Sequence, residues 1–259
     1  SPCHDQITLR PGLPPHRHLT RPRPNRDVQT ESGECDFVNG LLEDRIEVAG
    51  LLARNPVAYK WKAPFRSVVL REVIFWRFLD LMTQSHELYK NCRGLGARIL
   101  LRSAIETSAI LYYLNIIIKD TLDERISFKD FSDKTSRLLL GSRSNSGEIA
   151  AINIMTIIAH VDKVYSGIAR IYSDLSESAH PNMDGMLLGY SKLDRSAHCT
   201  ELRDRWKEHT RDHLKLMDIN MDCFEYEHST VWVGLTDKLE AWIAENDARL
   251  EAEGGAESR

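Results

Sequence analysis

The sequence predicts an all-α protein, a helical bundle of about five to seven helices with a disordered N-terminal arm. Beyond residue 33, apolar side chains recur at spacings of three and four, which is the period of an amphipathic helix. No run of alternating apolar and polar residues lies between turn formers, so a sheet is not expected. Of the 259 residues, 42% are hydrophobic and 28% are charged, which is typical of a globular domain with a proper core.

Composition divides the chain into three regions. Residues 1–33 are rich in proline and arginine and have hardly any apolar side chains, so they cannot bury enough surface to offset the entropy of ordering. A flexible arm is expected there. Residues 34–250 are expected to form a single helical domain, and residues 251–259 an acidic tail that frays.

The first half of the domain contains three expected helices. Residues 36–52 have helical apolar spacing, which Asn55-Pro56 interrupts. Residues 66–92 form a long amphipathic helix, and the glycines at 94 and 96 mark its end. Residues 97–118 form a second long helix, which is apolar around much of its circumference.

The second half contains four further helices. A short one over residues 133–140 stops before the glycine at 141. A third long helix is expected over residues 148–179, and two more over residues 194–227 and 230–250.

Several classes of protein are disfavoured by the totals. A net charge of -4 gives no global reason to expect nucleic acid, although a local basic patch is compatible with it. Five scattered cysteines without a CxxC pair indicate free thiols in a reducing compartment and suggest neither zinc nor a disulfide framework. No cofactor is expected. The longest apolar segments, Ile149–Val161 and Ile110–Ile118, are too short to cross a bilayer. We expect a protein of the bacterial cytoplasm.

A polar stripe marks the stretch from Val164 to Gly185. Tyr165, Tyr172, Ser176 and His180 follow one another at offsets of seven, four and four residues, which places them on one side of a single helix. Because a residue before proline avoids helical geometry, Pro181 should place His180 at the carboxyl end of that helix.

A second polar stripe lies on the apolar helix over residues 97–118. Arg98, Arg102 and Glu106 are spaced four residues apart and therefore stack on one face. Burying an arginine or a carboxylate is costly unless the groups pair or point into a cavity.

Together the stripes suggest a metal-independent site for a phosphodiester. In this hypothesis His180 transfers a proton, Arg102 holds the phosphate and Tyr172 polarises it as the third catalytic residue. Ser176, Tyr165 and Glu106 would bind or orient the ligand, with Glu106 fixing Arg102. The alternative is a structural strut of Arg102, Glu106, Tyr172 and Ser176, with His180 only capping the helix.

A metal centre is a further alternative. Glu177 with His180, and Glu225 with His228, have the E-x-x-H spacing of di-iron carboxylate bundles, which also take glutamates such as Glu106 from other helices. Such pairs also arise by chance in a chain with this many Glu and His residues.

Two stretches carry a resemblance to a known family. LLRSAIETSAILYYL (100–114) and YSGIARIYSDLSESAHP (165–181) contain R-S-x-x-E followed by Y-x(6)-Y-x(3)-S-x(3)-H-P. The pattern resembles an uncharacterised bacterial all-helical family that is distantly similar to the HEPN group of defence and toxin-antitoxin proteins. The resemblance covers residues 66–185, the central part of the chain, and implies a helical core but no settled activity.

The HEPN likeness also carries expectations about chemistry and assembly. HEPN ribonucleases use a loose R-x(4-6)-H motif, which here falls at Arg203 and His209. Arg10 and His16 repeat this spacing inside the expected arm, and a solvated charged helix face is the alternative interpretation. The likeness implies a homodimer, for which we expect an exposed face from Trp232 to Trp242.

The leading hypothesis is therefore an HEPN-like protein that binds or processes RNA or a nucleotide. One alternative is a non-catalytic helical interaction or regulatory module that binds a protein partner. A second alternative is a di-iron carboxylate bundle.

Overall fold

The structure is a computed structural model that describes residues 46–142 and 149–253. The chain divides into two units, Ser1–Gly50 and Leu51–Arg259, and the fold described below is that of the second. The predicted arm over residues 1–33 lies outside the described residues, as does the predicted tail from residue 254 onward.

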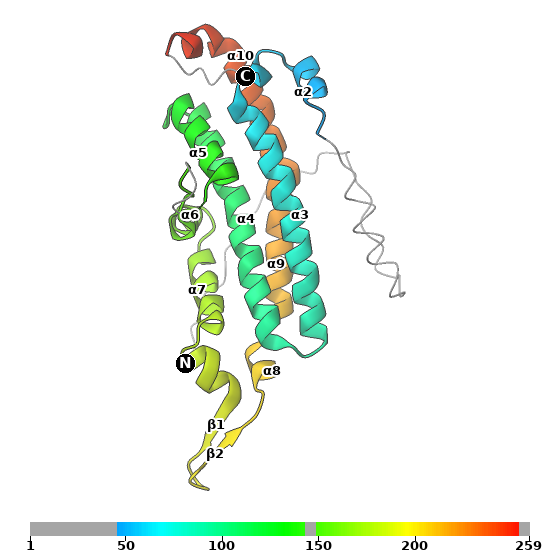
Figure 1. The fold of residues 1–259 in the computed structure, drawn as a ribbon, viewed down its shortest axis with the longest axis vertical. Helices are drawn as coiled ribbons and strands as arrows, with labels where there is room; N and C mark the ends of the chain where they lie inside the picture. The colour runs from blue at the N-terminus through cyan, green and yellow to red at the C-terminus, as the bar shows by residue number, and fades with distance from the viewer. Residues whose placement is uncertain (1–45, 143–148, 254–259) are drawn as a thin grey trace, which may run out of the picture. The chain divides into compact units, whose positions relative to one another are not determined.

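Helices dominate the described residues, which confirms the all-α class (Figure 1). They are α2 (Val48–Arg54), η1 (Ala58–Lys60), α3 (Lys62–Lys90), α4 (Gly94–Leu122), α5 (Phe128–Leu140), α6 (Ile154–Val161), α7 (Ile168–Ala179), η2 (Met183–Leu188), α8 (Trp206–His209), α9 (His213–Tyr226), η3 (Glu227–Val231) and α10 (Trp232–Ala252). Two short strands, β1 (Ser191–Asp194) and β2 (Cys199–Leu202), complete the set.

Helix α4 is the centre of the bundle. Its apolar residues surround the helix axis, and Leu101, Ala104, Leu111 and Leu114 are fully buried. Helices α3, α5, α6, α7, α9 and α10 all pack against it. A helix that is apolar nearly all round must be covered on every side, so the composition of α4 dictates its place in the fold.

The third long helix expected over residues 148–179 is wrong, because the structure divides it into α6 and α7. Gly167 interrupts the helix with a φ of 100°, a conformation that favours glycine. The Asp162 carboxylate fixes the break by accepting hydrogen bonds from the backbone N–H groups of Gly167 and Ala169, both at 3.0 Å. Tyr165 therefore lies before the break and does not share a helix with Tyr172.

The expectation that the chain has no strands is wrong for residues 191–202, where a helix was predicted from residue 194. Strands β1 and β2 form an antiparallel hairpin with Ser191 opposite Leu202. Asp194 starts the turn, because its carboxylate accepts from the backbone N–H groups of Ser196 at 2.9 Å and Ala197 at 3.0 Å.

Helices α9 and α10 join without a loop. The π-helical turn η3 lies between them and continues the chain from Tyr226 into Trp232. Trp232 is buried: its indole N–H donates to Ser67 at 3.3 Å and Arg71 lies over its ring. The predicted exposed face from Trp232 to Trp242 is therefore wrong at Trp232.

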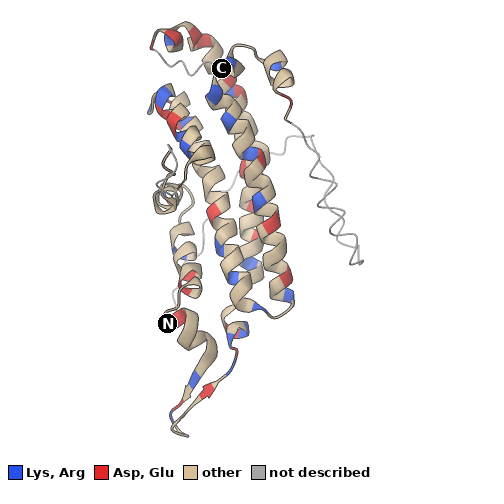
Figure 2. Cartoon of the chain, in the orientation of Figure 1, with Lys and Arg blue, Asp and Glu red and all other residues tan. Residues whose placement is uncertain are grey.

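Charged side chains of both signs are interspersed along the described helices (Figure 2). Among residues 46–142 and 149–253, no helix combines the length and the apolar character needed to cross a bilayer.

Candidate functional site

Arg102 is the centre of a polar network between α4 and α7. Its Nε donates to the Ser176 hydroxyl at 2.8 Å, and its Nη2 donates to the Tyr172 hydroxyl at 2.6 Å. The Tyr172 hydroxyl in turn donates to Glu106 at 2.9 Å, and Glu106 lies 3.0 Å from the Arg102 Nη2. The structure thus brings together four of the six residues that the sequence singles out.

The network is closed upon itself. Ser176 donates its own hydroxyl proton to the Tyr172 carbonyl at 2.7 Å, and the Arg102 guanidinium lies over the Tyr172 ring at 5.0 Å. The Arg102 and Glu106 side chains are each 24% exposed. Because these groups satisfy one another, the arrangement is that of a strut that holds α7 against α4.

His180 lies outside this network. As predicted from Pro181, it caps α7 with extended backbone, at φ −91° and ψ 144°. Its side chain is exposed and makes no hydrogen bond to any part of the chain that the structure describes. The two groups that the phosphodiester hypothesis places on one ligand, His180 and Arg102, are therefore not joined by any contact.

Tyr165 belongs to a second network, around a buried carboxylate. Its hydroxyl donates to Glu227, the first residue of η3, and Asn115 donates to the other carboxylate oxygen at 2.6 Å. Burial raises the pKa of Glu227, while the hydrogen bonds from Tyr165 and Asn115 oppose that rise. The Asn115 carbonyl oxygen has no hydrogen-bond partner among the described residues.

Glu227→Gln is expected to stabilise the protein at pH 7 by about 1 kcal/mol. A glutamine carries no charge to bury, and its Oε1 can accept from the Asn115 amide while its Nε2 donates to the Tyr165 hydroxyl. Because the pKa of Glu227 is raised in the folded protein, the wild type loses stability as the pH rises and this carboxyl ionises. The gain in stability from Glu227→Gln should therefore shrink at lower pH, where the carboxyl is protonated.

Urea unfolding of Glu227→Gln at several pH values measures this gain. Glu225→Gln removes the same charge from an exposed neighbour on α9 and should leave the free energy of unfolding unchanged. A loss of stability in Glu227→Gln at pH 7 would contradict the assignment of a buried carboxylate whose pKa is raised by burial.

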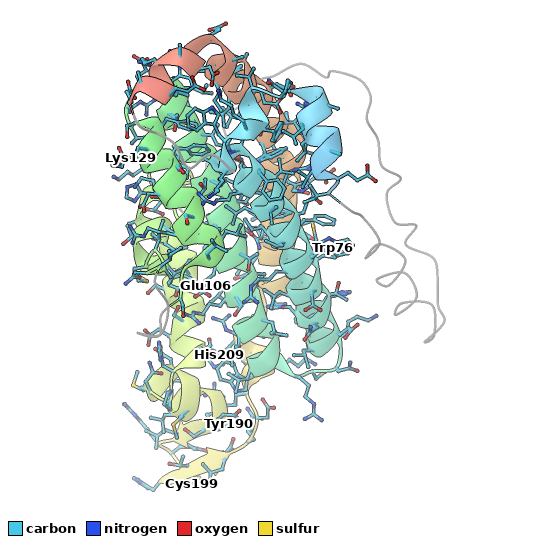
Figure 3. All side chains as sticks on the ribbon, turned by 45° about the horizontal axis from the view of Figure 1, so that its top comes forward. Trp76, Glu106, Lys129, Tyr190, Cys199 and His209 are labelled. Atoms are coloured by element: carbon cyan, nitrogen blue, oxygen red, sulfur yellow. The ribbon has the colours of Figure 1, made fainter. Side chains whose placement is uncertain are left out.

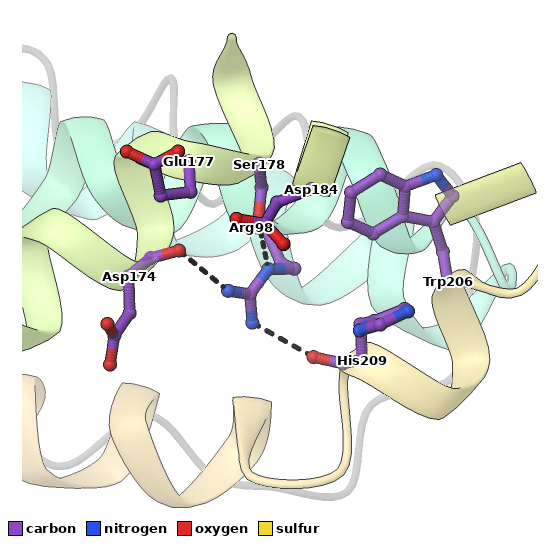
Figure 4. Close-up of a pocket in the computed structure, with 7 residues that line it drawn as sticks. All are labelled: Arg98, Asp174, Glu177, Ser178, Asp184, Trp206 and His209. Carbon is purple, nitrogen blue, oxygen red and sulfur yellow. Dashed lines mark hydrogen bonds between the residues drawn. The ribbon is translucent and has the colours of Figure 1, made fainter. Parts of the chain in front are cut away.

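Arg98 lines a cavity between α4, α7 and α8 (Figure 4). The cavity has a volume of about 250 Å³ and is lined by Arg98, Asp174, Glu177, Ser178, Asp184, Trp206 and His209. Arg98 donates to the Ser178 hydroxyl at 2.7 Å and to two carbonyl oxygens, of His209 at 2.9 Å and of Asp174 at 3.1 Å. Burial lowers the pKa of Arg98, and the charge of Asp174 opposes that effect.

The charges of this cavity do not suit a phosphate. Three carboxylates, Asp174, Glu177 and Asp184, line the same space as the single guanidinium of Arg98. A phosphate site needs an excess of positive groups or free N–H donors. The Nε2–H of His209 is not free for a phosphate, because it donates to the Leu188 carbonyl at 3.3 Å.

The R-x(4-6)-H pair is split between two environments. Arg203 is exposed after β2 and forms an ion pair with Glu208 at 3.4 Å. His209 ends the short helix α8 and lies beside the Arg98 cavity, near the hairpin that carries Tyr190 and Cys199 (Figure 3).

The five residues of the di-iron alternative do not form a ligand set. Glu106 is bound to Arg102 and Tyr172, His228 is buried beside Phe75 and Phe224, and both Glu177 and Glu225 are exposed. Nowhere in the described ranges do three or more His, Cys, Asp or Glu side chains gather as a metal site would require.

Sequence reasoning missed a buried histidine, His213, at the start of α9. Its Nε2 lies 3.1 Å from the Ser85 hydroxyl, which donates its own proton to the Ala97 carbonyl at 2.8 Å. The Nε2 must therefore carry the proton, and Nδ1 has no partner among the described residues. Burial, aided by the charges of Arg98 and His86, lowers the pKa of His213 to about 4.

Exposed apolar side chains gather on η2 and the hairpin. We call this set the hairpin surface, and its members are Met183, Met186, Leu187, Tyr190, Leu193 and Leu202. Leu193 is 61% exposed and Leu202 is 82% exposed. Apolar side chains that cluster at the surface, methionine above all, are characteristic of protein binding sites.

Comparison with known proteins adds no family to this description. The chain matches no protein-family model, and searches of curated proteins and of solved structures find no similar protein.

Proposed function

We propose that this chain is a non-catalytic helical interaction module, which binds a protein partner through the hairpin surface. The observation that carries the proposal is the closed network around Arg102. A guanidinium that already donates to Ser176 and Tyr172 and pairs with Glu106 is a poor phosphate ligand, because a phosphate would have to displace those partners.

The position of His180 supports the same conclusion. A metal-independent ribonuclease of the kind that the HEPN likeness implies needs its proton-transfer group and its phosphate-binding arginine at the same phosphate. His180 is exposed beyond the carboxyl end of α7, while Arg102 is held between α7 and α4.

The hairpin surface supports a binding role. Its six apolar side chains come from one continuous stretch that leaves the bundle after α7 and returns at α8. Within the described residues, nothing in the bundle covers Leu193 or Leu202, so both side chains are accessible to a partner.

Arg102→Met tests the structural role of the network. We expect it to lower the free energy of unfolding by about 2 kcal/mol, because Glu106 and Tyr172 lose their partner in a partly solvent-screened site. His180→Ala should unfold like the wild type. Arg170→Met, which removes an exposed arginine from α7, is the matched control and should also be neutral.

A cleavage assay on mixed RNA, run beside the thermal unfolding of each variant, tests the absence of catalysis. We expect no cleavage by the wild-type protein. RNA cleavage that His180→Ala abolishes without a change in melting temperature would overturn the proposal and favour the ribonuclease hypothesis.

A further inference from the structure

We propose that β1 pairs with β1 of a second copy of this chain, antiparallel and centred on Leu193, so that the two hairpins form one four-stranded sheet. The inference rests on the proposed function, because it assigns the partner of the hairpin surface. It places the homodimer contact on the hairpin and not on the helix that contains Trp232.

The backbone hydrogen bonds of the hairpin determine which groups of β1 point outward. The Arg203 N–H donates to the Tyr190 carbonyl at 2.9 Å, so these two residues form a hydrogen-bonded pair. Pairs alternate along an antiparallel ladder, so Lys192 with Glu201 is the next hydrogen-bonded pair, and Leu193 with Thr200 is not. The N–H and C=O of Leu193 therefore point away from β2.

The outer edge of β1 is open at Leu193. At Ser191 it is covered, because the Arg205 guanidinium donates to the Ser191 carbonyl at 2.6 Å. No described residue makes a backbone hydrogen bond to the outward groups of Leu193. An uncovered strand edge is a template for pairing with another chain.

The side chains of β1 are complementary to themselves in this register. When Leu193 faces Leu193 of the second copy, Lys192 lies opposite Asp194 of that copy, and the reverse pair forms by symmetry. Lys192 also faces Glu201 within its own hairpin. One face of the sheet then carries alternating charges, and opposite charges across strands are favourable.

The other face of the sheet carries Leu193 and Leu202, together with Ser191 and Thr200. Ser191, two residues before Leu193, is directly opposite Leu202, so the two leucines are diagonal neighbours on adjacent strands. In the dimer the two copies of Leu193 lie side by side at the symmetry axis. Their mutual contact lowers the exposure of Leu193, which is 61% exposed in the monomer.

The edge of β2 is less suited than the edge of β1 to pair with the same strand of a second copy. Its outward backbone groups are those of Thr200 and Leu202, and pairing these two residues across an axis sets Glu201 opposite Glu201 of the second copy. Like charges directly opposite each other destabilise a sheet. Centring on Thr200 sets Cys199 opposite Glu201 of the second copy and so gives no pair of opposite charges, and centring on Leu202 requires residues beyond the end of the strand.

A proline substitution on each strand distinguishes pairing through β1 from pairing through β2. Of the backbone groups, Leu193→Pro removes only an outward N–H, which the hairpin itself does not use, and it also takes the leucine side chain from the axis; Thr200→Pro removes the corresponding outward N–H on β2. The wild type and Thr200→Pro should show twice the chain mass of 29.7 kDa by light scattering, and Leu193→Pro should show the monomer mass. Wild-type thermal unfolding in Leu193→Pro verifies that it is folded.

A charge exchange provides the second test, in a variant that keeps opposite charges at the facing positions 192 and 201. Lys192→Glu with Glu201→Lys retains an opposite pair within each hairpin but sets a glutamate opposite Asp194 of the second copy. We expect its dimer dissociation constant to rise about tenfold, because two attractive pairs become repulsive. Lys192→Arg should dimerise like the wild type.

A wild-type protein that stays monomeric at high concentration, or a Leu193→Pro variant that dimerises like Thr200→Pro, would overturn the pairing. Neither result would affect the proposed non-catalytic role, which depends on the RNA assay and on Arg102→Met. Conversely, RNA cleavage by a dimer would overturn the proposed function and leave the strand pairing in place.

Discussion

Gly185→Ala is expected to destabilise the protein by about 3 kcal/mol, because there is no space for a methyl group at this position. A Cβ built on Gly185 would overlap the backbone carbonyl oxygen of His180 and lie 3.1 Å from that of Glu177. These backbone oxygens at the end of α7 cannot rotate away from an added methyl group as a flexible side chain could. Either η2 must move away from α7 or the cap of α7 must open.

Urea denaturation of Gly185→Ala against Gly234→Ala measures this effect. Gly234 lies in α10, where an added Cβ meets nothing within 4 Å, so alanine there should stabilise the helix by about 0.5 to 1 kcal/mol. The two variants carry the same chemical change with opposite expected signs. Equal stabilities of the two variants would contradict the packing of η2 against the end of α7.

The second large effect concerns pH. His213 should lower the stability of the protein as the pH falls from about 6.5 to about 4, by up to about 3 kcal/mol. Its pKa is about 4 in the folded protein, against 6.5 for an ordinary histidine. Between those values the unfolded chain binds a proton that the folded protein does not, so acid favours unfolding, and the effect is absent above pH 7.

His213→Gln should remove this part of the pH dependence, since a glutamine amide can donate to Ser85 without titrating in this range. The slope of unfolding free energy against pH between 4 and 6.5 should fall in the variant. His160→Gln makes the same exchange at an exposed histidine of α6 and controls for the effect of the substitution itself. The raised pKa of Glu227 acts in the opposite direction in both proteins and cancels in the comparison.

The sequence predicted the long helices because their apolar spacing extends over many residues. Helix α4 is the clearest case, since its apolar residues cover most of its circumference and it is buried accordingly. The end of α7 at His180 was predictable because proline acts on the residue before it. These are local effects that one stretch of sequence contains in full.

The interruption at Gly167 and the two short strands depend on contacts that the spacing of apolar residues does not reveal. The interruption at Gly167 requires the side chain of Asp162 as an acceptor, and a single glycine in a helical pattern does not reveal that. Strands of four residues are too short to show a period of two, so β1 and β2 resemble any polar segment. Their pairing comes from the turn at Asp194.

The candidate site was predictable only in part. Spacing places Arg102 and Glu106 on one face of α4, and Tyr172 and Ser176 on one face of α7, and these faces do meet. Spacing does not indicate whether such groups satisfy one another or point into a cavity. His213 gave no signal, because the partner that determines its protonation, Ser85, is 128 residues away in the chain.

Arg98 has a consequence for the chain between α7 and α8. It donates to Asp174 and Ser178 on α7, before this segment begins, and to His209 on α8, where the segment ends. The Arg98 guanidinium therefore links the two ends of this segment, as a disulfide would, but through hydrogen bonds that can break and re-form. Linking the two ends lowers the conformational entropy of the segment between α7 and α8 in the monomer. Less entropy is therefore lost when η2 and the hairpin bind a partner.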